Sequence, residues 1–203
     1  MPDPGEIAAI VLAAGTSSRF GSNKLLHPLT RHGATLPLAA HSLMPWLETF
    51  GHVTVVTRPD ADTFCTALEI ELGAAIFGRI RWIACAEAAQ GMASSLSCGV
   101  RASPAATGWI IGLADMPAVP SSAIAGIRNA LLEGANLAAP YCNGRRGHPV
   151  GFASRYHQEL LKLKGDTGAR QLIERDLSRI VQLNIDNEGI FTDIDIPGDL
   201  QHL

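Results

Sequence analysis

Short apolar runs alternate along the chain with longer stretches whose apolar residues recur at helical spacing. The apolar runs predict strands at Ile7–Leu12, Val53–Thr57, Ile80–Ala84, Trp109–Leu113, Leu137–Ala139 and Ile180–Ile185. The amphipathic stretches predict helices at Leu36–Phe50, Ala61–Leu72, Met92–Arg101, Ser121–Leu132, Ser154–Leu163 and Ala169–Arg175. Such alternation favours an α/β fold, with a mostly parallel Rossmann-like sheet between two layers of helices.

The length and the composition favour one domain over residues 1–203. Of the 203 residues, 47% are hydrophobic, which is enough for one well-packed core and little for two. We find no internal repeat and no low-complexity linker in the sequence.

Charge and hydropathy limit the classes of partner that the protein is expected to bind. With 16 Lys and Arg against 19 Asp and Glu, the chain lacks the basic excess of a protein that binds a nucleic-acid polymer. No apolar run is long enough to cross a bilayer, and the start MPDPGE is unlike a secretory signal, so we expect a cytoplasmic protein without a membrane partner. The four cysteines form no C-x-x-C pair, which predicts reduced thiols in or near the core: Cys65, Cys85, Cys98 and Cys142.

The first predicted strand leads directly into a loop of small residues, AAGTSS, followed by Arg19 and Lys24. Small side chains let backbone N–H groups approach an anion, and the two cations can neutralise phosphate oxygens. The spacing of Gly15 and Gly21 fits neither the P-loop nor the dinucleotide fingerprint G-x-G-x-x-G. The loop therefore predicts a phosphate site of another type, and a simple turn with two solvated cations is the alternative.

Asp115 ends the otherwise apolar strand IIGLADMP, where an ionised carboxylate needs solvent, an ion pair or a metal. If this strand neighbours the first one, Asp115 and the small-residue loop share one crevice, and Asp115 could hold Mg²⁺ against phosphate oxygens. A turn or cap role is the alternative. Near the C-terminus, Asp199 is expected to cap the last segment, which leaves Asp193 or Asp195 as a second metal contact.

Two further segments carry cations. The turn GRRGHP supplies Arg145, Arg146 and His148, which could lie between a phosphorylated acceptor and a bound nucleotide. A solvated basic hairpin with His148 packed on the following proline is the alternative. In GDTGAR, Asp166 or Thr167 is expected to cap a helix, and acceptor binding is the functional alternative.

Taken together in this order, LAAGTSSRFGSNKLL, GLADMP, GRRGHPVGF and GDTGARQLIERD resemble the MobA-like nucleotidyltransferases, in particular the molybdenum cofactor cytidylyltransferases. The resemblance runs from about Ile7 to Leu200. It implies the nucleotide-diphospho-sugar transferase type of α/β fold.

The resemblance also implies roles for individual residues. Leu12, Ala13, Ala14 and Gly15 match the stretch that wraps the base and phosphates, Arg19 and Lys24 match the triphosphate-binding cations, and Ser95 matches a serine near the base. Asp115 matches the metal-binding aspartate, and Asp195 matches the aspartate of the terminal Asp-x-Pro segment, a possible second ligand. Phe20 replaces a usual methionine, a change that is expected to affect packing only. Ala84-Cys85-Ala86-Glu87 stands where relatives often carry an asparagine.

The implied reaction moves CMP from a Mg²⁺-bound CTP to the phosphate of molybdopterin and releases pyrophosphate. Ala14 favours CTP, because relatives that use GTP generally read LAGG at this place. Arg145, Arg146 and His148 would face the acceptor, and a molybdoenzyme or its chaperone would be a transient partner. The alternatives are GTP or another phosphorylated acceptor, including one in a purine-catabolism-linked cofactor step, or a non-catalytic module that binds nucleotide and delivers a cofactor. The missing G-x-G-x-x-G disfavours a dinucleotide-dependent oxidoreductase.

Overall fold

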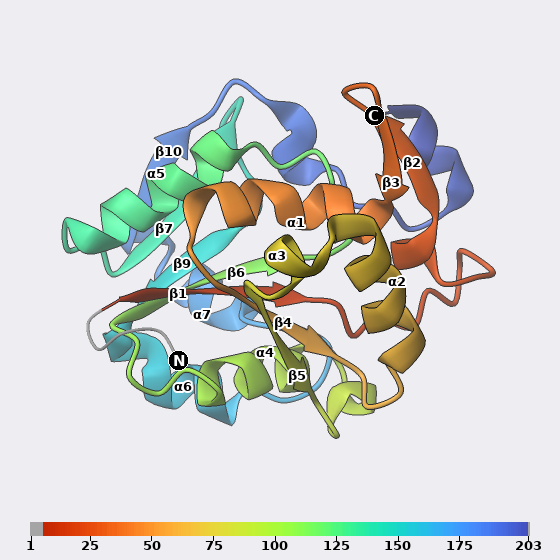
Figure 1. Ribbon diagram of the computed structural model, residues 1–203. Coiled ribbons are helices and arrows are strands. Elements are labelled where there is room, and N and C mark those ends of the chain that lie inside the picture. The colour runs from red at the N-terminus through yellow and green to blue at the C-terminus, as the bar shows by residue number, and fades with distance from the viewer. Residues whose placement is uncertain (1–5, 203) are drawn as a thin grey trace.

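The computed structural model describes residues 6–202, which fold into a central sheet covered by helices on both faces (Figure 1). The sheet order is β10-β7-β9-β6-β1-β4-β5, with the short β8 paired to β7. Strand bounds are β1 Ile7–Leu12, β4 Val53–Thr57, β5 Ile80–Ala84, β6 Gly108–Leu113, β7 Leu137–Cys142, β8 Arg145–Arg146, β9 Val150–Ala153 and β10 Ile180–Asn184. The expected three-layer α/β/α architecture is confirmed.

Most neighbouring strands are parallel, and β9 is the exception inside the sheet. It runs antiparallel to β6 and β7, between which it lies. The chain leaves β1 toward β4 and β5 and returns to β6 on the other side of β1. The carboxyl ends of β1 and β6 therefore meet at a topological switch point, where sheets of this type bind ligands.

One face of the sheet is covered by α1 Leu38–Thr49, α2 Asp62–Leu72, α3 Ala74–Phe77 and α5 Ser121–Leu132. The other is covered by α4 Met92–Arg101, α6 His157–Lys162 and α7 Arg170–Arg175. Figure 1 shows α1 and α5 above the sheet and α4 and α6 below it. All six residues of β1 are buried, as its continuous apolar run predicts, because helices pack on both of its sides.

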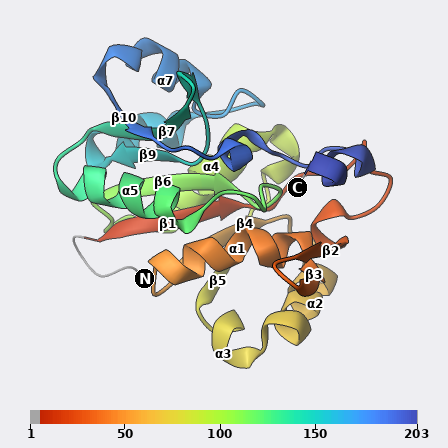
Figure 2. The ribbon, with the colours of Figure 1, turned by 90° about the horizontal axis from the view of Figure 1, so that it is seen from above.

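Several expected boundaries need correction. The helix expected over Leu36–Phe50 begins at Leu38, because β3 Ala34–Pro37 pairs with β2 Pro28–Arg31 in a separate two-stranded sheet. Figure 2 shows this hairpin beside α2, at one end of the molecule. The helix expected over Ser154–Leu163 is a 3₁₀ turn, Ser154–Tyr156, followed by α6. Strand β9 was not expected, because its four residues directly follow the turn residues of GRRGHP.

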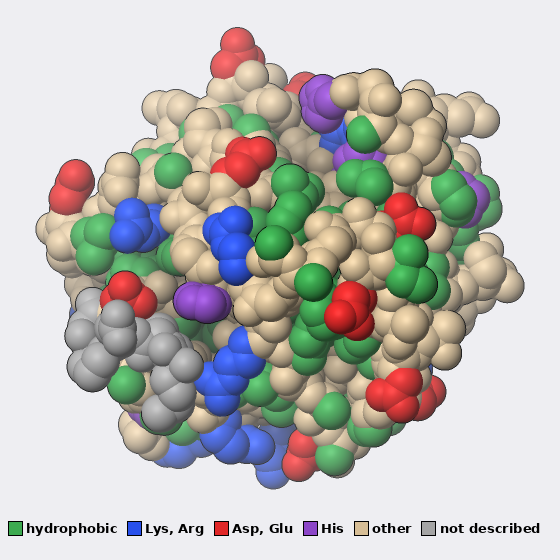
Figure 3. All heavy atoms as spheres, viewed as in Figure 1, with side chains coloured by type: hydrophobic (Ala, Val, Ile, Leu, Met, Phe, Trp, Pro, Cys, Tyr) green, Lys and Arg blue, Asp and Glu red, His purple; other side chains and the backbone are tan. Residues whose placement is uncertain are grey.

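Charged side chains of both signs are spread over the face in Figure 3, and several Lys and Arg side chains gather where α4 and α6 lie in Figure 1. Among the described residues, no helix combines the length and the apolar character needed to cross a bilayer. All four cysteines are free thiols, two of them buried and two half-buried, as expected.

Candidate active site

The small-residue loop and the loop of Asp115 leave adjacent strands. Strand β1 pairs in parallel with β6 in a register that sets Leu12 opposite Leu113, which confirms that the two strands are neighbours. Backbone bonds hold the two exits in place: the Ala13 N–H donates to the Val56 carbonyl, and the Ala114 N–H donates to the Leu12 carbonyl.

Beyond Ala13 the loop is open to solvent but its far end is anchored. Gly15 is exposed, and a Cβ added there would meet no atom within 4 Å. Phe20 is buried in the core and packs edge-on against His27, with ring centroids 5.2 Å apart, in keeping with the expected packing role. Near Lys24, the Ser17 hydroxyl accepts the Lys24 N–H and the Asn23 side chain accepts the Leu25 N–H. The loop is thus open to solvent at Gly15 and anchored at Lys24.

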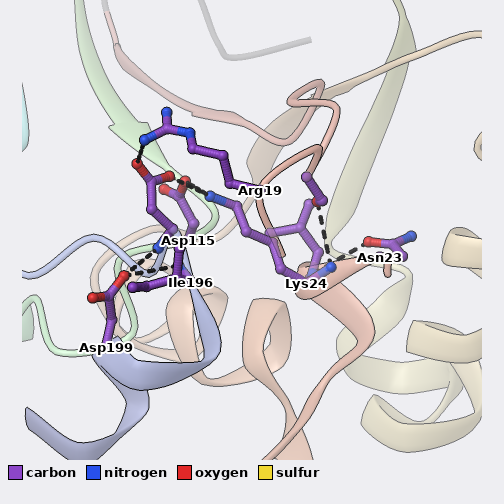
Figure 4. Close-up of polar contacts among 9 residues, drawn as sticks. Arg19, Asn23, Lys24, Asp115, Ile196 and Asp199 are labelled. Atoms are coloured by element: carbon purple, nitrogen blue, oxygen red, sulfur yellow. Dashed lines mark hydrogen bonds and ion pairs between the residues drawn. The ribbon is translucent and has the colours of Figure 1, made fainter. Parts of the chain in front are cut away.

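Lys24 extends from this anchor to two carboxylates (Figure 4). Its Nζ lies 2.8 Å from Asp115 Oδ2 and 3.1 Å from Asp195 Oδ1, with only 9% of the side chain exposed. Burial acts to lower the pKa of Lys24, but the two carboxylates outweigh it and hold that pKa above its usual value. Lys24 is therefore a cation fixed between two acids.

The surroundings of Asp115 raise its pKa above the usual value. Burial raises its pKa, and the nearby Asp193 adds to that rise, whereas Lys24 opposes it. Its second oxygen, Oδ1, is buried and has no hydrogen-bond partner among the described residues. A buried carboxylate oxygen without a partner is costly, so Asp115 has an unused ligand position.

The terminal segment brings Asp195 to Asp115 from the far end of the chain. The Ile194 N–H donates to the Asp115 carbonyl, and the Ile194 side chain is fully buried. Asp199 Oδ2 accepts the backbone N–H groups of Asp195 and Ile196, as expected of a capping residue. Asp195 is thus positioned by backbone contacts on both sides, where it also pairs with Arg19 at 2.8 Å.

The donor set fits a hard divalent cation in part. Asp115 and Asp195 supply carboxylate oxygens of the kind that Mg²⁺ takes, and Asp115 has an oxygen to spare. Within residues 6–202, no three His, Cys, Asp or Glu side chains lie close enough to hold a metal by themselves. Oxygens from a bound ligand or from water would have to complete the shell, which is the usual arrangement for Mg²⁺ bound together with phosphates.

A pocket of about 190 Å³ lies on the other side of the same strand ends. Leu12, Ile111, Val150 and Phe152 belong to the core cluster on the α4 side and line it, and Leu113, two residues before Asp115, also contacts it. Arg146 and His148 approach it from the β8–β9 segment, Thr167 from the loop before α7, and Arg170 from the first position of α7.

The three residues expected to face the acceptor, Arg145, Arg146 and His148, do not all lie at one place in the structure. Arg146 and His148 line the pocket, whereas Arg145 is exposed and stacks over Phe191 with its guanidinium carbon 4.3 Å from the ring centroid. Burial and the neighbouring Arg146 lower the pKa of His148 to about 4, against an opposing effect of Asp193, so the imidazole is neutral near pH 7. The GRRGHP turn is a hairpin, as the structural alternative anticipated, but not a wholly solvated one.

Ser95, which the resemblance places near the base, is 3% exposed inside α4 and does not line the pocket; Gly91 holds the N-cap position of that helix. The expectation that Asp166 or Thr167 caps a helix is wrong. Asp166 and Thr167 do not cap α7, whose N-cap position is taken by Ala169. The loop before α7 approaches α4 closely at Gly91, which has a φ of +117° and where an added Cβ would clash with Asp166 Oδ1. The loop of Asp166 packs against the start of α4, and the Ala93 N–H donates to Gly165.

Comparison with known proteins agrees with this geometry. The family model described as the MobA-like NTP transferase domain matches residues 9–180. The chain is 33% identical over 202 residues to the purine catabolism protein PucB of Bacillus subtilis (strain 168), covering 94% of this chain and 92% of PucB.

Solved structures share the fold. The crystal structure of Rv0371c from Mycobacterium tuberculosis H37Rv has a TM-score of 0.77 at 23% identity, with 97% of both chains covered. A manganese complex of Rv0371c has a TM-score of 0.74 at 22% identity, with 98% of this chain and 97% of the other covered. By the extent of the family match and the identity to PucB, the chain belongs to the MobA-like nucleotidyltransferase family.

Proposed function

We propose that the protein transfers the CMP unit of CTP to the phosphate of a molybdopterin acceptor and releases pyrophosphate. The observation that carries this proposal is the group formed by Lys24, Asp115 and Asp195, which lies beside an open small-residue loop at the ends of two adjacent strands. This group joins a fixed cation to carboxylates at the place where a triphosphate would lie.

In this proposal the triphosphate lies along residues Leu12 to Gly15. The Ala13 N–H and the Leu12 carbonyl are bonded to Val56 and Ala114, so the backbone groups nearer Gly15 contact the base and phosphates. The free space above Gly15 supports this placement, because a ligand can approach the backbone there without displacing protein atoms. Arg19 is 73% exposed on its side chain and can turn from Asp195 to a phosphate. The Ser95 side chain is buried inside α4, so in this proposal its hydroxyl makes no contact with the base.

Asp115 and Asp195 are the proposed ligands of Mg²⁺. Mg²⁺ would neutralise charge on the phosphate oxygens and orient them. The unpartnered Asp115 Oδ1 supports this assignment. The manganese bound to the structurally similar Rv0371c is consistent with a divalent metal, although at 22% identity that likeness concerns the fold.

The chemical step is an in-line displacement at the α-phosphorus. An oxygen of the acceptor phosphate forms the new P–O bond as the bond between the α-phosphorus and the bridging oxygen to the β-phosphorus breaks. Lys24 and Arg19 stabilise the negative charge that spreads over the phosphoryl oxygens, and no residue needs to form a covalent intermediate. The acceptor approaches from the side of Arg146 and His148.

Two candidates compete with this reaction. The identity to a protein named for purine catabolism favours a purine-catabolism-linked step, whose acceptor could differ. A nucleotide-binding module that delivers a cofactor to a molybdoenzyme or its chaperone would bind CTP without releasing pyrophosphate. Lys24 placed between two carboxylates argues for catalysis over mere delivery.

Ligand-induced stabilisation tests the nucleotide. With Mg²⁺ present, we expect CTP to raise the unfolding temperature more than GTP or ATP does at the same concentration, because a ligand stabilises in proportion to its affinity. Stabilisation by GTP alone would contradict the choice of CTP. Pyrophosphate release from CTP with molybdopterin, compared with sugar phosphates, then tests the acceptor.

A further inference from the structure

The pocket on the α4 side has a chemical character that defines what can enter it. Its walls are mainly apolar, with Leu12, Ile111, Val150 and Phe152 on the sheet, and Leu96 and Ile173 on the helices. Arg146 and Arg170 add positive charge, and none of the described lining residues is acidic. The pocket therefore suits a ligand with an apolar body and an anionic group.

Arg146 is the charged group that a ligand can use. Within the described part of the chain its guanidinium makes no ion pair and no side-chain hydrogen bond, whereas Arg170 is paired with Glu174 at 2.6 Å. Beside Arg146, His148 is neutral, and its Nδ1 is buried without a hydrogen-bond partner among residues 6–202. The wall thus combines an unpaired cation with an imidazole that still lacks a partner.

The position of Arg146 follows from the two-residue strand β8. Arg146 lies opposite Tyr141 on β7, and Arg145 lies opposite Cys142. Because successive side chains of a strand point to opposite faces, only one of the two arginines can face the pocket. Arg146 faces it, and Arg145 stacks on Phe191 instead.

The size of the pocket limits the ligand. About 190 Å³ is less than the roughly 300–1,000 Å³ that encloses a whole drug-sized ligand. One ring system can enter, and the rest of the molecule must lie outside the pocket; Leu113, which lines it, is two residues before Asp115. A planar aromatic ring fits best, because Phe152 and the sulfur of Met92 pack well against rings and a guanidinium stacks on their faces.

We propose that this pocket holds the aromatic ring of the acceptor, and that Arg146 binds an anionic group attached to it while Arg145 takes no part. This inference rests on the proposed function, since it names where the acceptor of that reaction lies. It adds a ring-binding subsite that contains no residue of the small-residue loop and shares only Leu12 with the stretch Leu12 to Gly15.

The test measures binding without the reaction. The probe is 6-hydroxymethylpterin monophosphate, whose pterin ring is fluorescent, titrated with the full-length protein in the absence of nucleotide and Mg²⁺. The wild type should bind the probe by anisotropy. Arg146→Gln should weaken binding roughly tenfold or more, because a charge-assisted bond is lost. Arg145→Gln, the matched control on the same strand, should stay within about twofold.

Two further measurements separate the ring from the phosphate. Ala169→Leu adds bulk at the pocket wall, where Ala169 is buried, and should abolish probe binding at the cost of some stability. Stabilisation of this variant by CTP with Mg²⁺, as large as that of the wild type, shows that the fold and the nucleotide site are kept. Ribose 5-phosphate should displace the probe only at much higher concentration. Absence of probe binding by the wild type, equal losses in the two arginine variants, or equal displacement by ribose 5-phosphate would each overturn the inference.

The proposed function fails by a different result. If the probe binds through Arg146 but CTP yields no pyrophosphate with molybdopterin, the reaction is wrong and the pocket stands. If pyrophosphate is released equally fast by Arg146→Gln and Arg145→Gln at limiting acceptor, the reaction stands and the pocket assignment is wrong.

Discussion

The Lys24 ammonium lies 2.8 Å from Asp115 Oδ2, although the two residues come from loops 91 positions apart in the sequence. The contact depends on the parallel pairing of β1 with β6, which places both loops at one edge of the sheet. Asp195 joins them at 3.1 Å through the terminal segment. In this arrangement Lys24 pairs with both carboxylates that the proposed metal would use.

Replacing Lys24 with Met should strengthen metal binding in the absence of nucleotide. The ammonium and a divalent cation compete for Asp115 and Asp195, and charges at this range interact by several kcal/mol at an effective dielectric of about 20. We expect Mn²⁺, measured by electron paramagnetic resonance, to bind Lys24→Met about tenfold or more tightly than wild type. Lys162→Met, which alters an exposed lysine of α6, should bind as wild type does.

The same variant should lose most of its kcat/KM for pyrophosphate release, because a phosphate-stabilising cation is gone. Unchanged Mn²⁺ affinity in Lys24→Met would show that Lys24 does not compete for the carboxylates.

Replacing Gly15 with Ala should weaken nucleotide binding and leave the fold intact. A Cβ at Gly15 meets no protein atom within 4 Å, and the backbone at Gly15 is not in the left-handed region, so alanine fits there without strain. The added methyl group would collide only with a bound ligand. Gly51→Ala is the matched control, since its Cβ is equally free and Gly51 lies at the end of α1. Thermal unfolding should give nearly equal midpoints for both variants without ligand. A full CTP-induced shift in Gly15→Ala would place the nucleotide elsewhere.

His148 should make stability depend on pH in a defined window. Its pKa in the folded protein is about 4, below the ordinary value of 6.5, with Arg146 and Asp193 as the charged groups that act on it. The unfolded chain takes up the proton first, so this contribution to stability is full above pH 6.5, falls as the pH drops toward 4, and then levels off. It amounts to at most about 3 kcal/mol.

Urea unfolding of wild type and His148→Gln at pH 7 and pH 4.5 checks this expectation. The wild type should lose more unfolding free energy than the variant between the two pH values. Parallel losses in the two proteins would mean that His148 titrates normally.

Asp199 should act on the site through the backbone that carries Asp195. Its Oδ2 accepts two backbone N–H groups, at 2.7 and 2.9 Å. Asp199→Ala should cost about 1 kcal/mol of unfolding free energy, as loss of a capping side chain does. It should also lower kcat/KM, because Asp195 is less well positioned. Asp199→Asn keeps an acceptor oxygen and should restore most of both quantities; an equal loss in Asn and Ala variants would point to charge instead.

The sequence allowed much of the fold to be predicted where burial is continuous. Strands β1, β4 and β5 and helices α4 and α5 begin and end where the apolar pattern places them. Strand β9 and the β2–β3 hairpin escaped prediction because each strand has only four residues and lies near Gly or Pro. Their existence depends on pairing with distant partners, such as β6 for β9, which local pattern does not encode.

The features of the candidate site also divide into those that the sequence predicts and those that depend on distant pairing. The position of Asp115 beside the end of the first strand could be anticipated, because parallel strands present their carboxyl ends at one edge. The separation of Arg145 from Arg146 could not, since it depends on the pairing of a two-residue strand. The pocket was also missed, because it is formed by side chains from β1, β6, β9, α4 and α7 together.

The most direct test of the account is pyrophosphate release from CTP by the wild type and by Asp115→Asn, with molybdopterin as acceptor and Mg²⁺ present. Asparagine keeps the size of the side chain but removes the charge that faces Lys24 and a metal. We predict release by the wild type that requires both acceptor and Mg²⁺, and a loss of at least about a hundredfold in a folded Asp115→Asn protein. Equal turnover by the two proteins, or no release by the wild type, would contradict the account.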